Sequence, residues 1–243
     1  GVSSVEQLKK IFDEENVKVS SSAENAVWRF HGEWWDMKAV VNELFGDVSD
    51  IEEFVSIGRF LQYNGLFYAV SSHKRHAPYQ SGCMVWQLNE TYPNAACTSL
   101  VEYYENIKPA YFAAKRAFSK FLLSFEYDKL SYKKGEKAVV KAYVSSEEEC
   151  SDIVVGFSLE QDGKVLFAEN KLVSLGAFQT EKVKETSFSV SADKFYKMIL
   201  RANYKGEEYK ETAILLVRND DGVCDKQTLF DYIKEVYNEN NAV

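Results

Sequence analysis

The spacing of apolar residues changes near residue 119, and this change limits the folds open to the chain. Before it, apolar residues recur every three or four positions, which is the period of an amphipathic helix. After it, short runs of β-branched and aromatic residues are separated by turn residues, which is typical of strands. We expect a helix-rich first domain over residues 1–118, an immunoglobulin-like antiparallel β-sandwich over 119–218 and a helical extension over 219–243.

Capping residues mark where the helices of the first domain begin and end. Ser4 stands before the first apolar periodic run, and Ser49 or Asp50 stands before the longest one, which reaches residue 74. These residue types accept hydrogen bonds from the free amide groups of a first helical turn. Gly46 is a typical helix terminator. The predicted helices are 5–15, 36–45, the long helix ending at 74, 110–118 and 225–238.

Two short loops in the second half of the chain predict β-hairpins. Asp162-Gly163 and Lys205-Gly206 each separate two strand-like apolar runs. Glycine accepts the positive φ that a two-residue hairpin turn requires. Together with the other strand-like runs, these hairpins give about seven short strands, the number expected for a sandwich.

A short apolar run at 82–88 lies between the longest helix and a loop. A run of this length between helices predicts a strand that is buried on both faces, as in a parallel sheet. Helix, buried strand, loop and helix in this order are typical of an α/β layer or barrel. The first domain is therefore predicted to be of the α/β class.

Charge and composition exclude several classes of protein. Acidic residues outnumber basic residues by 37 to 29, so the net charge of −8 argues against a nucleic-acid binder. No apolar run reaches the roughly 20 residues of a membrane span. The four cysteines form no CxxC pair and the three histidines are scattered, so no metal site is expected. Unpaired thiols favour a reducing, cytoplasmic location.

The best candidate for a binding site follows the predicted strand at 82–88. Trp86 offers a flat apolar face, and Gln87 and Asn89 offer carboxamide donors and acceptors. An aromatic face beside such groups is suited to binding a sugar. His31 is a second candidate because Trp residues surround it in the sequence, although a buried, hydrogen-bonded histidine remains the alternative. A further cluster, His73 to His76, is interpreted as a solvated helix end.

The segment 81–90 reads SGCMVWQLNE and resembles the last barrel strand of family 2 glycoside hydrolases of the β-mannosidase type. In that family a small residue and Gly precede hydrophobic residues and the sequence Trp-Gln-Leu-Asn-Asp. Residues 98–118 are similar to the family's following segment, which includes a helix opened by Lys-Pro. Glu90 and Glu102 stand where the family has Asp. The resemblance is specific over 54–118 and extends with less specific motifs back to residue 1, and after residue 118 only the architecture is similar.

This resemblance implies the C-terminal part of a (β/α)8 TIM barrel, followed by the β-sandwich. A whole barrel takes about 250 residues, so residues 1–118 hold only part of one. The family's enzymes are retaining exo-glycosidases, which need two carboxyl groups about 5–5.5 Å apart and no cofactor. By the resemblance, both catalytic glutamates lie upstream of Gly1. The chain is then expected to contain no catalytic residue and to be inactive by itself.

The expected partner is a carbohydrate, bound by Trp86, Gln87, Asn89, Glu90 and His31. The resemblance favours a terminal β-mannoside, while galactose and glucosamine remain open. Glu90 is expected to bond to sugar hydroxyls or to neighbouring loops rather than to donate the catalytic proton.

Two alternatives stay open from the sequence. The first is a non-catalytic carbohydrate-binding or interaction module whose platform is formed by Trp28, Trp34, Trp35 and Trp86. The second concerns the edge that a partial barrel would expose at 82–88. Proteins normally cover such an edge, so either the N-terminal helices pack over it or two chains self-associate through it.

Overall fold

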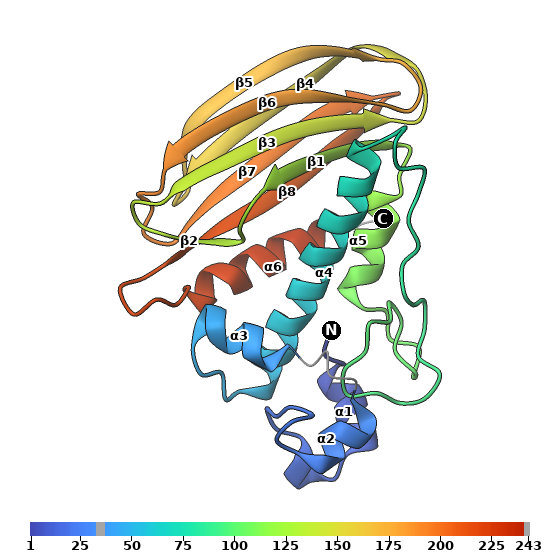
Figure 1. Ribbon diagram of the computed structural model, residues 1–243, viewed down its shortest axis with the longest axis vertical. Helices are drawn as coiled ribbons and strands as arrows, with labels where there is room; N and C mark the ends of the chain where they lie inside the picture. The colour runs from blue at the N-terminus through green and yellow to red at the C-terminus, as the bar shows by residue number, and fades with distance from the viewer. Residues whose placement is uncertain (33–36, 241–243) are drawn as a thin grey trace. The chain divides into compact units, whose positions relative to one another are not determined.

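The computed structural model describes residues 1–32 and 37–240, which form two compact units. Unit 1 comprises Gly1–Phe67, Met84–Lys115 and Ile233–Val243, and unit 2 comprises Tyr68–Cys83 and Arg116–Tyr232. The ribbon in Figure 1 carries the element labels used below. The helices are α1 (Val5–Ile11), the short 3-10 helix η1 (Glu14–Asn16), α2 (Ala26–His31), α3 (Lys38–Phe45), α4 (Ile51–Arg75), α5 (Pro109–Ala117) and α6 (Lys226–Asn240).

The helix boundaries follow the local capping signals. Ser4 accepts a hydrogen bond from the amide of Gln7 at 3.1 Å, so the predicted cap of α1 is confirmed. Asp50 caps α4 in the same way, through the amide of Glu53 at 2.8 Å. Gly46 ends α3 with φ 74°, a conformation that glycine adopts without strain. Helix α1 is shorter than predicted because the chain leaves it at Ile11 and forms η1 separately.

Unit 1 is built around buried aromatic side chains. Trp28 has 1% of its surface exposed and contacts Phe12 and Phe54, with ring centroids 5.5 and 6.4 Å away. Burying side chains of this size stabilises a fold by about 1.5–3 kcal/mol each. These contacts join α2 to the chain after α1 and to the start of α4.

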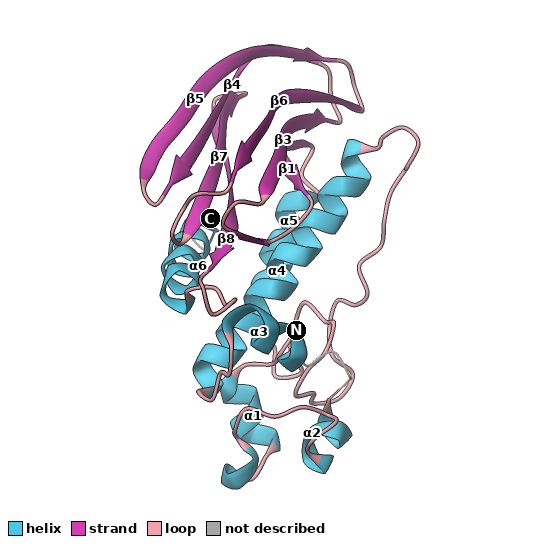
Figure 2. Ribbon diagram, turned by 60° about the vertical axis from the view of Figure 1, so that its left-hand side comes forward, coloured by secondary structure: helices cyan, strands magenta, loops and turns pink. Residues whose placement is uncertain are grey.

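Within the described part of residues 1–118 the chain forms helices and loops, with isolated bridges in place of strands. Figure 2 shows the whole connection between α4 and α5 as loop. The predicted strand at 82–88 is therefore absent, and the strand edge expected there does not exist. Among the described residues, no helix combines the length and the apolar character that crossing a membrane requires.

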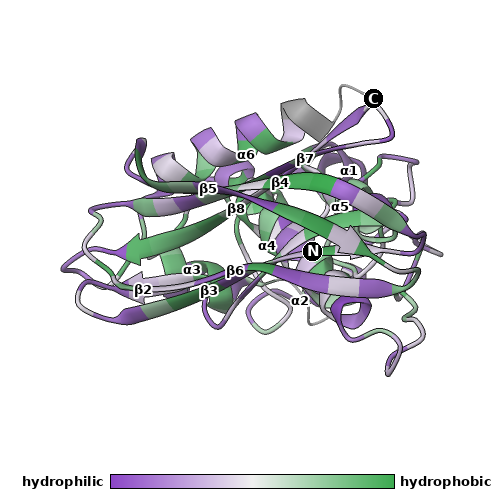
Figure 3. Cartoon of the chain, turned by 90° about the horizontal axis from the view of Figure 1, so that it is seen from above, coloured by the Kyte–Doolittle hydropathy of each residue, from purple (hydrophilic) through white to green (hydrophobic). Residues whose placement is uncertain are grey.

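Unit 2 contains two sheets that face each other as layers (Figure 3). One sheet has the strand order β1-β3-β6 and the other has the order β2-β8-β7-β4-β5. All neighbouring strands are antiparallel except β2 and β8, which pair in parallel. The strands are β1 (Phe121–Tyr127), β2 (Ser131–Lys133), β3 (Lys137–Ser146), β4 (Cys150–Gln161), β5 (Lys164–Leu175), β6 (Gln179–Ser189), β7 (Phe195–Tyr204) and β8 (Glu207–Arg218).

The interior of the sandwich follows from the alternation of side chains along each strand. In β4, Ile153, Val155, Phe157 and Leu159 are buried, while the residues between them are more exposed. This period of two is what a strand with one core face and one outer face requires. The sandwich predicted from the sequence is confirmed at the level of two packed, mostly antiparallel sheets.

Both predicted hairpins are present. Asp162 and Gly163 join β4 to β5 with φ values of 46° and 82°, and Lys205 and Gly206 join β7 to β8 with φ values of 52° and 82°. Positive φ at both central residues matches the twist of the flanking strands. The turn chemistry therefore sets the register of both hairpins.

The outer strands of the two sheets are joined by ion pairs. Lys171 of β5 lies 2.6 Å from Glu181 of β6, and Lys184 of β6 lies 2.9 Å from Glu169 of β5. The ammonium group of Lys184 also lies 4.3 Å from the centre of the Phe167 ring. Charged side chains therefore line the edge where the two layers meet.

The end of α4 is less solvated than the sequence suggests. The Arg75 guanidinium lies 5.5 Å from the ring centres of both Tyr68 and Tyr143 and donates to Ser124 at 3.2 Å. Burial lowers the pKa of Arg75. The interpretation of this cluster as a solvated helix end holds for the exposed His76 and is wrong for Arg75.

Candidate functional site

The Trp86 segment, defined here as residues 84–90, carries the side chains that the sequence singles out. Its alternate side chains are exposed to solvent, with exposed fractions of 98% for Met84, 77% for Trp86 and 60% for Leu88. Large apolar side chains with this exposure form a surface on which an apolar ligand face can pack. The segment therefore presents an indole and no core residue at its centre.

Among the described residues, the backbone hydrogen bonds of the Trp86 segment run to one neighbouring stretch, Leu100 and Val101. The carbonyl of Leu88 accepts from the amide of Val101 at 2.8 Å, and that of Gln87 accepts from Leu100 at 3.0 Å. The amide of Glu90 donates to Val101 at 3.3 Å. A strand buried on both faces needs a hydrogen-bonded neighbour along each edge and a layer on each face. The described residues supply one neighbour, so the prediction of a buried strand is wrong.

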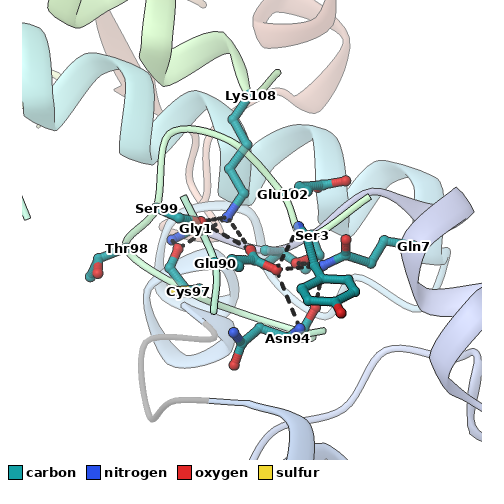
Figure 4. A network of polar contacts seen from close by, with 12 residues as sticks. Gly1, Ser3, Gln7, Glu90, Asn94, Cys97, Thr98, Ser99, Glu102 and Lys108 are labelled. Atoms are coloured by element: carbon teal, nitrogen blue, oxygen red, sulfur yellow. Dashed lines mark hydrogen bonds and ion pairs between the residues drawn. The ribbon is translucent and has the colours of Figure 1, made fainter. Parts of the chain in front are cut away.

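Glu90 ends the segment and lies inside unit 1, as Figure 4 shows. Its residue is 3% exposed, and its carboxylate bonds only to protein groups among those described. Five donors, from side chains and from backbone amides, surround this carboxylate. Oε1 accepts from Ser99 Oγ at 2.9 Å and Lys108 Nζ at 3.2 Å, and Oε2 accepts from Gln7 Nε2 at 2.8 Å, the Tyr103 amide at 3.2 Å and the Asn94 amide at 3.3 Å.

Lys108 provides the opposite charge. Its ammonium group is fully buried and also donates to the carbonyl of Cys97 at 3.2 Å and to Ser99 Oγ at 2.9 Å. Burial lowers the pKa of Lys108, and the carboxylate of Glu90 opposes this shift. All three donor positions of the ammonium are thus used within the network.

A second buried carboxylate, Glu102, ties the start of α1 to the same loop. It accepts from the amide of Ser4 at 2.5 Å and from the hydroxyl of Ser4 at 2.6 Å. Arg59 of α4 forms an ion pair with it, and Asn106 donates to it at 3.2 Å. No sequence motif connects Arg59 or Gln7 with these acids, because the partners are far apart along the chain.

The remaining predicted site residues lie around this network. Gln87 is half-buried, and its side chain donates to the sulfur of Cys97 at 3.5 Å. Asn89 is exposed and donates to the carbonyl of Glu90 at 3.2 Å. The Nδ1 atom of His31 lies 3.0 Å from the carbonyl oxygen of Pro93, so the imidazole is fixed to the loop that follows the Trp86 segment.

The Trp platform of the alternative interpretation is not formed as expected. Trp28 belongs to the core of unit 1, and its indole nitrogen donates to the carbonyl of Asn16 at 3.2 Å. It is therefore unable to stack on a ligand. Trp34 and Trp35 lie outside the described residues, which leaves Trp86 as the exposed indole among those described.

The polar groups of this region bond mainly to one another. Each of the two buried carboxylates forms an ion pair within unit 1, Glu90 with Lys108 and Glu102 with Arg59. Within the described ranges, no group of three or more His, Cys, Asp or Glu side chains is placed to hold a metal ion. The hydrogen bonds and the ion pair of Glu90 fix the end of the Trp86 segment, and the indole of Trp86 is exposed to solvent.

Comparison with known proteins gives structural likeness without sequence likeness. No known sequence family matches the chain, and no curated protein matches it in sequence. The solved structure of a β-D-mannosidase from Dictyoglomus thermophilum matches 89% of the chain with a TM-score of 0.67 and 17% identity. An exo-chitosanase from Amycolatopsis orientalis, in complex with PNP-β-D-glucosamine, matches 88% of it with a TM-score of 0.68 and 16% identity.

These matches show that the chain shares its fold with part of two glycosidases. The chain spans 26% of the length of each of them, so the likeness concerns about a quarter of each enzyme. At this level of identity the likeness concerns the fold and carries no residue's role.

Proposed function

We propose that this chain is the C-terminal part of a retaining family 2 glycoside hydrolase that removes terminal β-linked sugars, with β-mannosides as the favoured substrate. Residues 1–118 would complete one wall of a TIM-barrel catalytic domain, 119–218 would form the sandwich that follows it and 219–243 a helical extension. The observation that carries this proposal is the match of nearly the whole chain to two exo-acting or β-glycoside-cleaving enzymes.

The Trp86 segment supplies the chemistry expected of such a wall. The exposed face of Trp86 can stack on the apolar C–H face of a sugar ring, while Gln87 and Asn89 can bond to its hydroxyls. Glu90 is assigned a positioning role, because its bonds to Lys108 and Ser99 hold the end of the segment in place. His31 is also assigned a positioning role. Its Nδ1 atom lies 3.0 Å from the carbonyl oxygen of Pro93, in the loop that follows the segment.

The reaction itself would use carboxylates from the remainder of the enzyme. A retaining mechanism needs one carboxylate to attack the anomeric carbon and a second carboxyl group to protonate the leaving oxygen. In this chain Glu90 and Glu102 are bound to cations and are not assigned to either step. We therefore expect no hydrolysis by the 243-residue chain alone.

The decisive experiment compares two proteins with aryl β-mannoside, β-glucosaminide and β-galactoside substrates. The 243-residue chain should be inactive, and a longer product of the same coding sequence should hydrolyse one of them, preferentially the mannoside. In that longer product Trp86→Ala should lower kcat/KM by about three- to tenfold, the loss expected for one stacking contact. Met84→Ala is the matched control, because Met84 is exposed on the same segment.

Three results would count against the proposal. Hydrolysis by the isolated chain would show that its catalytic carboxylates lie within it. Equal effects of Trp86→Ala and Met84→Ala would remove the indole from the site. A preference for the glucosaminide or the galactoside would overturn the mannoside assignment, while the assignment as a glycosidase would stand.

A non-catalytic carbohydrate-binding module is the second candidate, favoured by the 77% exposure of Trp86 in the chain itself. In that case no product of the coding sequence would hydrolyse a glycoside. The isolated chain would still bind β-linked oligosaccharides, with a change of tryptophan fluorescence that Trp86→Ala abolishes.

Self-association belongs to the same proposal, now through exposed side chains rather than through a strand edge. Met84, Trp86 and Leu88 together expose a large apolar surface on this chain. In the isolated chain they would pair with a second copy. Light scattering should then show a dimer that a Met84→Ser, Trp86→Ser variant converts to a monomer, and an unchanged monomer in both would contradict this.

A further inference from the structure

Unit 2 contains a cavity of about 390 Å³ whose lining residues all belong to that unit. Its walls come from the end of α4 and the turn after it, the residues that follow α5, the end of β3 and the turn before β6. The volume falls within the range of small-molecule sites, about 300–1,000 Å³. The glycosidase proposal makes no use of this cavity.

Internal bonds fix the walls of the cavity. Lys74 of α4 donates to the carbonyl of Ser119 and forms an ion pair of 2.9 Å with Glu147. One side chain thereby joins three of the walls. In the turn before β6, the side chain of Gln179 accepts from the amide of Gly176 at 2.9 Å. A site whose walls are bonded in this way needs little reorganisation to accept a ligand.

Two exposed phenylalanines line the cavity. Phe118 is 47% exposed and Phe178 is 63% exposed, although a phenyl ring gains by burial. Phe178 also has φ 58°, a conformation that costs a residue with a side chain about 1 kcal/mol or more. The fold thus places an aromatic ring in solvent, on strained backbone, beside a cavity.

The lysine and the glutamate that line the cavity form an ion pair with each other. Lys74 and Glu147 neutralise each other, and Ser146, which also lines the cavity, donates its hydroxyl to the carbonyl of Glu148 at 2.6 Å. His73 also lines the cavity, and within the described residues its buried Nδ1 atom has no hydrogen-bond partner. An unsatisfied buried nitrogen costs about 1–3 kcal/mol, and a rotation of the ring toward a bound hydroxyl would recover this.

We propose that this cavity is a binding site for a neutral sugar unit. The phenyl rings match the apolar C–H faces of a pyranose, and the imidazole of His73 and the carboxylate of Glu147 match its hydroxyls. The internally neutralised ion pair disfavours a charged ligand, because such a ligand would lose water without gaining an unpaired opposite charge. The ligand class follows from these residues and does not depend on the catalytic assignment.

The test titrates the 243-residue chain with mannose, mannobiose, glucosamine and glucuronate and follows backbone amide shifts by NMR. The neutral sugars should shift the amides of Phe118, Ser146 and Gln179 with a millimolar Kd, and the two charged sugars should bind more weakly. Phe178→Gly keeps a residue suited to the positive φ and removes the ring, so it should fold normally. It should weaken binding by about two- to tenfold, the value of one aromatic contact.

Two variants serve as controls. Tyr79→Ala removes a ring that is 95% exposed near the cavity but does not line it, and it should leave binding unchanged. Glu147→Gln leaves the charge of Lys74 unbalanced, so it should reverse the preference in favour of glucuronate. Absence of shifts at the cavity, preference of the unaltered chain for a charged sugar, or equal effects of Phe178→Gly and Tyr79→Ala would each overturn the proposal.

Discussion

The ammonium group of Lys108 lies 3.2 Å from the carboxylate of Glu90, and neither side chain has any exposed surface. The two residues are 18 positions apart and fix the end of the Trp86 segment to the start of α5. Removing two charges from water is costly, so such a pair persists only when further hydrogen bonds satisfy both groups. Ser99 meets this condition by contacting both partners.

Removal of one partner of this pair should be strongly destabilising. Lys108→Met leaves the carboxylate of Glu90 buried without its counter-charge, which costs about 3–5 kcal/mol of unfolding free energy. Urea unfolding followed by circular dichroism measures this. The matched control is Lys10→Met, which breaks the exposed pair with Glu6 and should cost less than about 1 kcal/mol. Similar costs for both variants would contradict the role given to the buried pair.

Two glycines of α4 should respond to alanine in opposite directions. Gly65 is exposed, and a Cβ atom added there meets nothing within 4 Å. Gly65→Ala should therefore raise the unfolding free energy by about 0.5–1 kcal/mol, because alanine restricts the unfolded chain and favours the helix. At Gly58 the added Cβ would lie 2.7 Å from Cγ2 of Val2, a fully buried residue.

Gly58→Ala should consequently lower the unfolding free energy by about 1–3 kcal/mol, the usual cost of overpacking. Thermal and urea unfolding of the two variants side by side provide the measurement, and each serves as the control for the other. A stabilised Gly58→Ala variant would contradict this prediction, because it would mean that the side chain of Val2 can move aside with no loss of unfolding free energy.

The four free thiols should differ in reactivity. Cys83 is half-buried, whereas Cys97, Cys150 and Cys224 are buried. Burial raises the pKa of Cys224 to about 11, so little of its reactive thiolate exists at mildly alkaline pH. Labelling of the native chain with a disulfide reagent should modify Cys83 alone, and denaturant should release the other three. Cys83→Ser should abolish the fast reaction, and fast reaction in that variant would contradict the order.

The acid stability of unit 2 should depend on Glu148. Lys205 and Lys120 bond to this carboxylate and lower its pKa from 4.5 to about 2. A folded pKa below the unfolded one adds stability above the unfolded value, and this contribution is lost as pH falls from about 4.5 to about 2. Glu148→Gln should flatten the decline of unfolding free energy over this window, and more so at low salt. An identical decline in both proteins would contradict the assignment.

The sequence predicted well those elements whose signals are local. Ser4 and Asp50 cap helices because a cap needs only the next three residues. The turn at Asp162-Gly163 works similarly, since its backbone conformation depends on two residues. Alternation in β4 was enough to separate core from surface.

The Trp86 segment was predicted wrongly because a strand depends on partners that the segment does not encode. An apolar run is compatible with a buried strand, and only neighbouring chain decides whether its side chains become buried. Here one side pairs with Val101 and its vicinity, and Met84 and Trp86 remain in solvent. An accessible face of Trp86 is what the sugar-binding hypothesis expects, whereas the absence of a strand around it was visible only in the structure.

The buried polar network was only half visible in the sequence. Glu90 stood out through its neighbours, but Gln7 and Lys108 reach it from 83 and 18 positions away. The charge and polarity of residues in the sequence do not determine which acid pairs with which base, because the pairing depends on how distant segments pack together. The ion pair of Arg59 with Glu102 was overlooked for the same reason.

The ion pairs along the β5–β6 edge have a consequence for how the chain behaves in crowded solution. A foreign strand that approached this edge would have to strip the hydration from Lys171 and Glu169 before it formed its first backbone bond. That cost discourages fibril-like stacking of one sandwich on the next. The apolar side chains of β5, such as Leu172, can therefore stay at the surface without seeding aggregates.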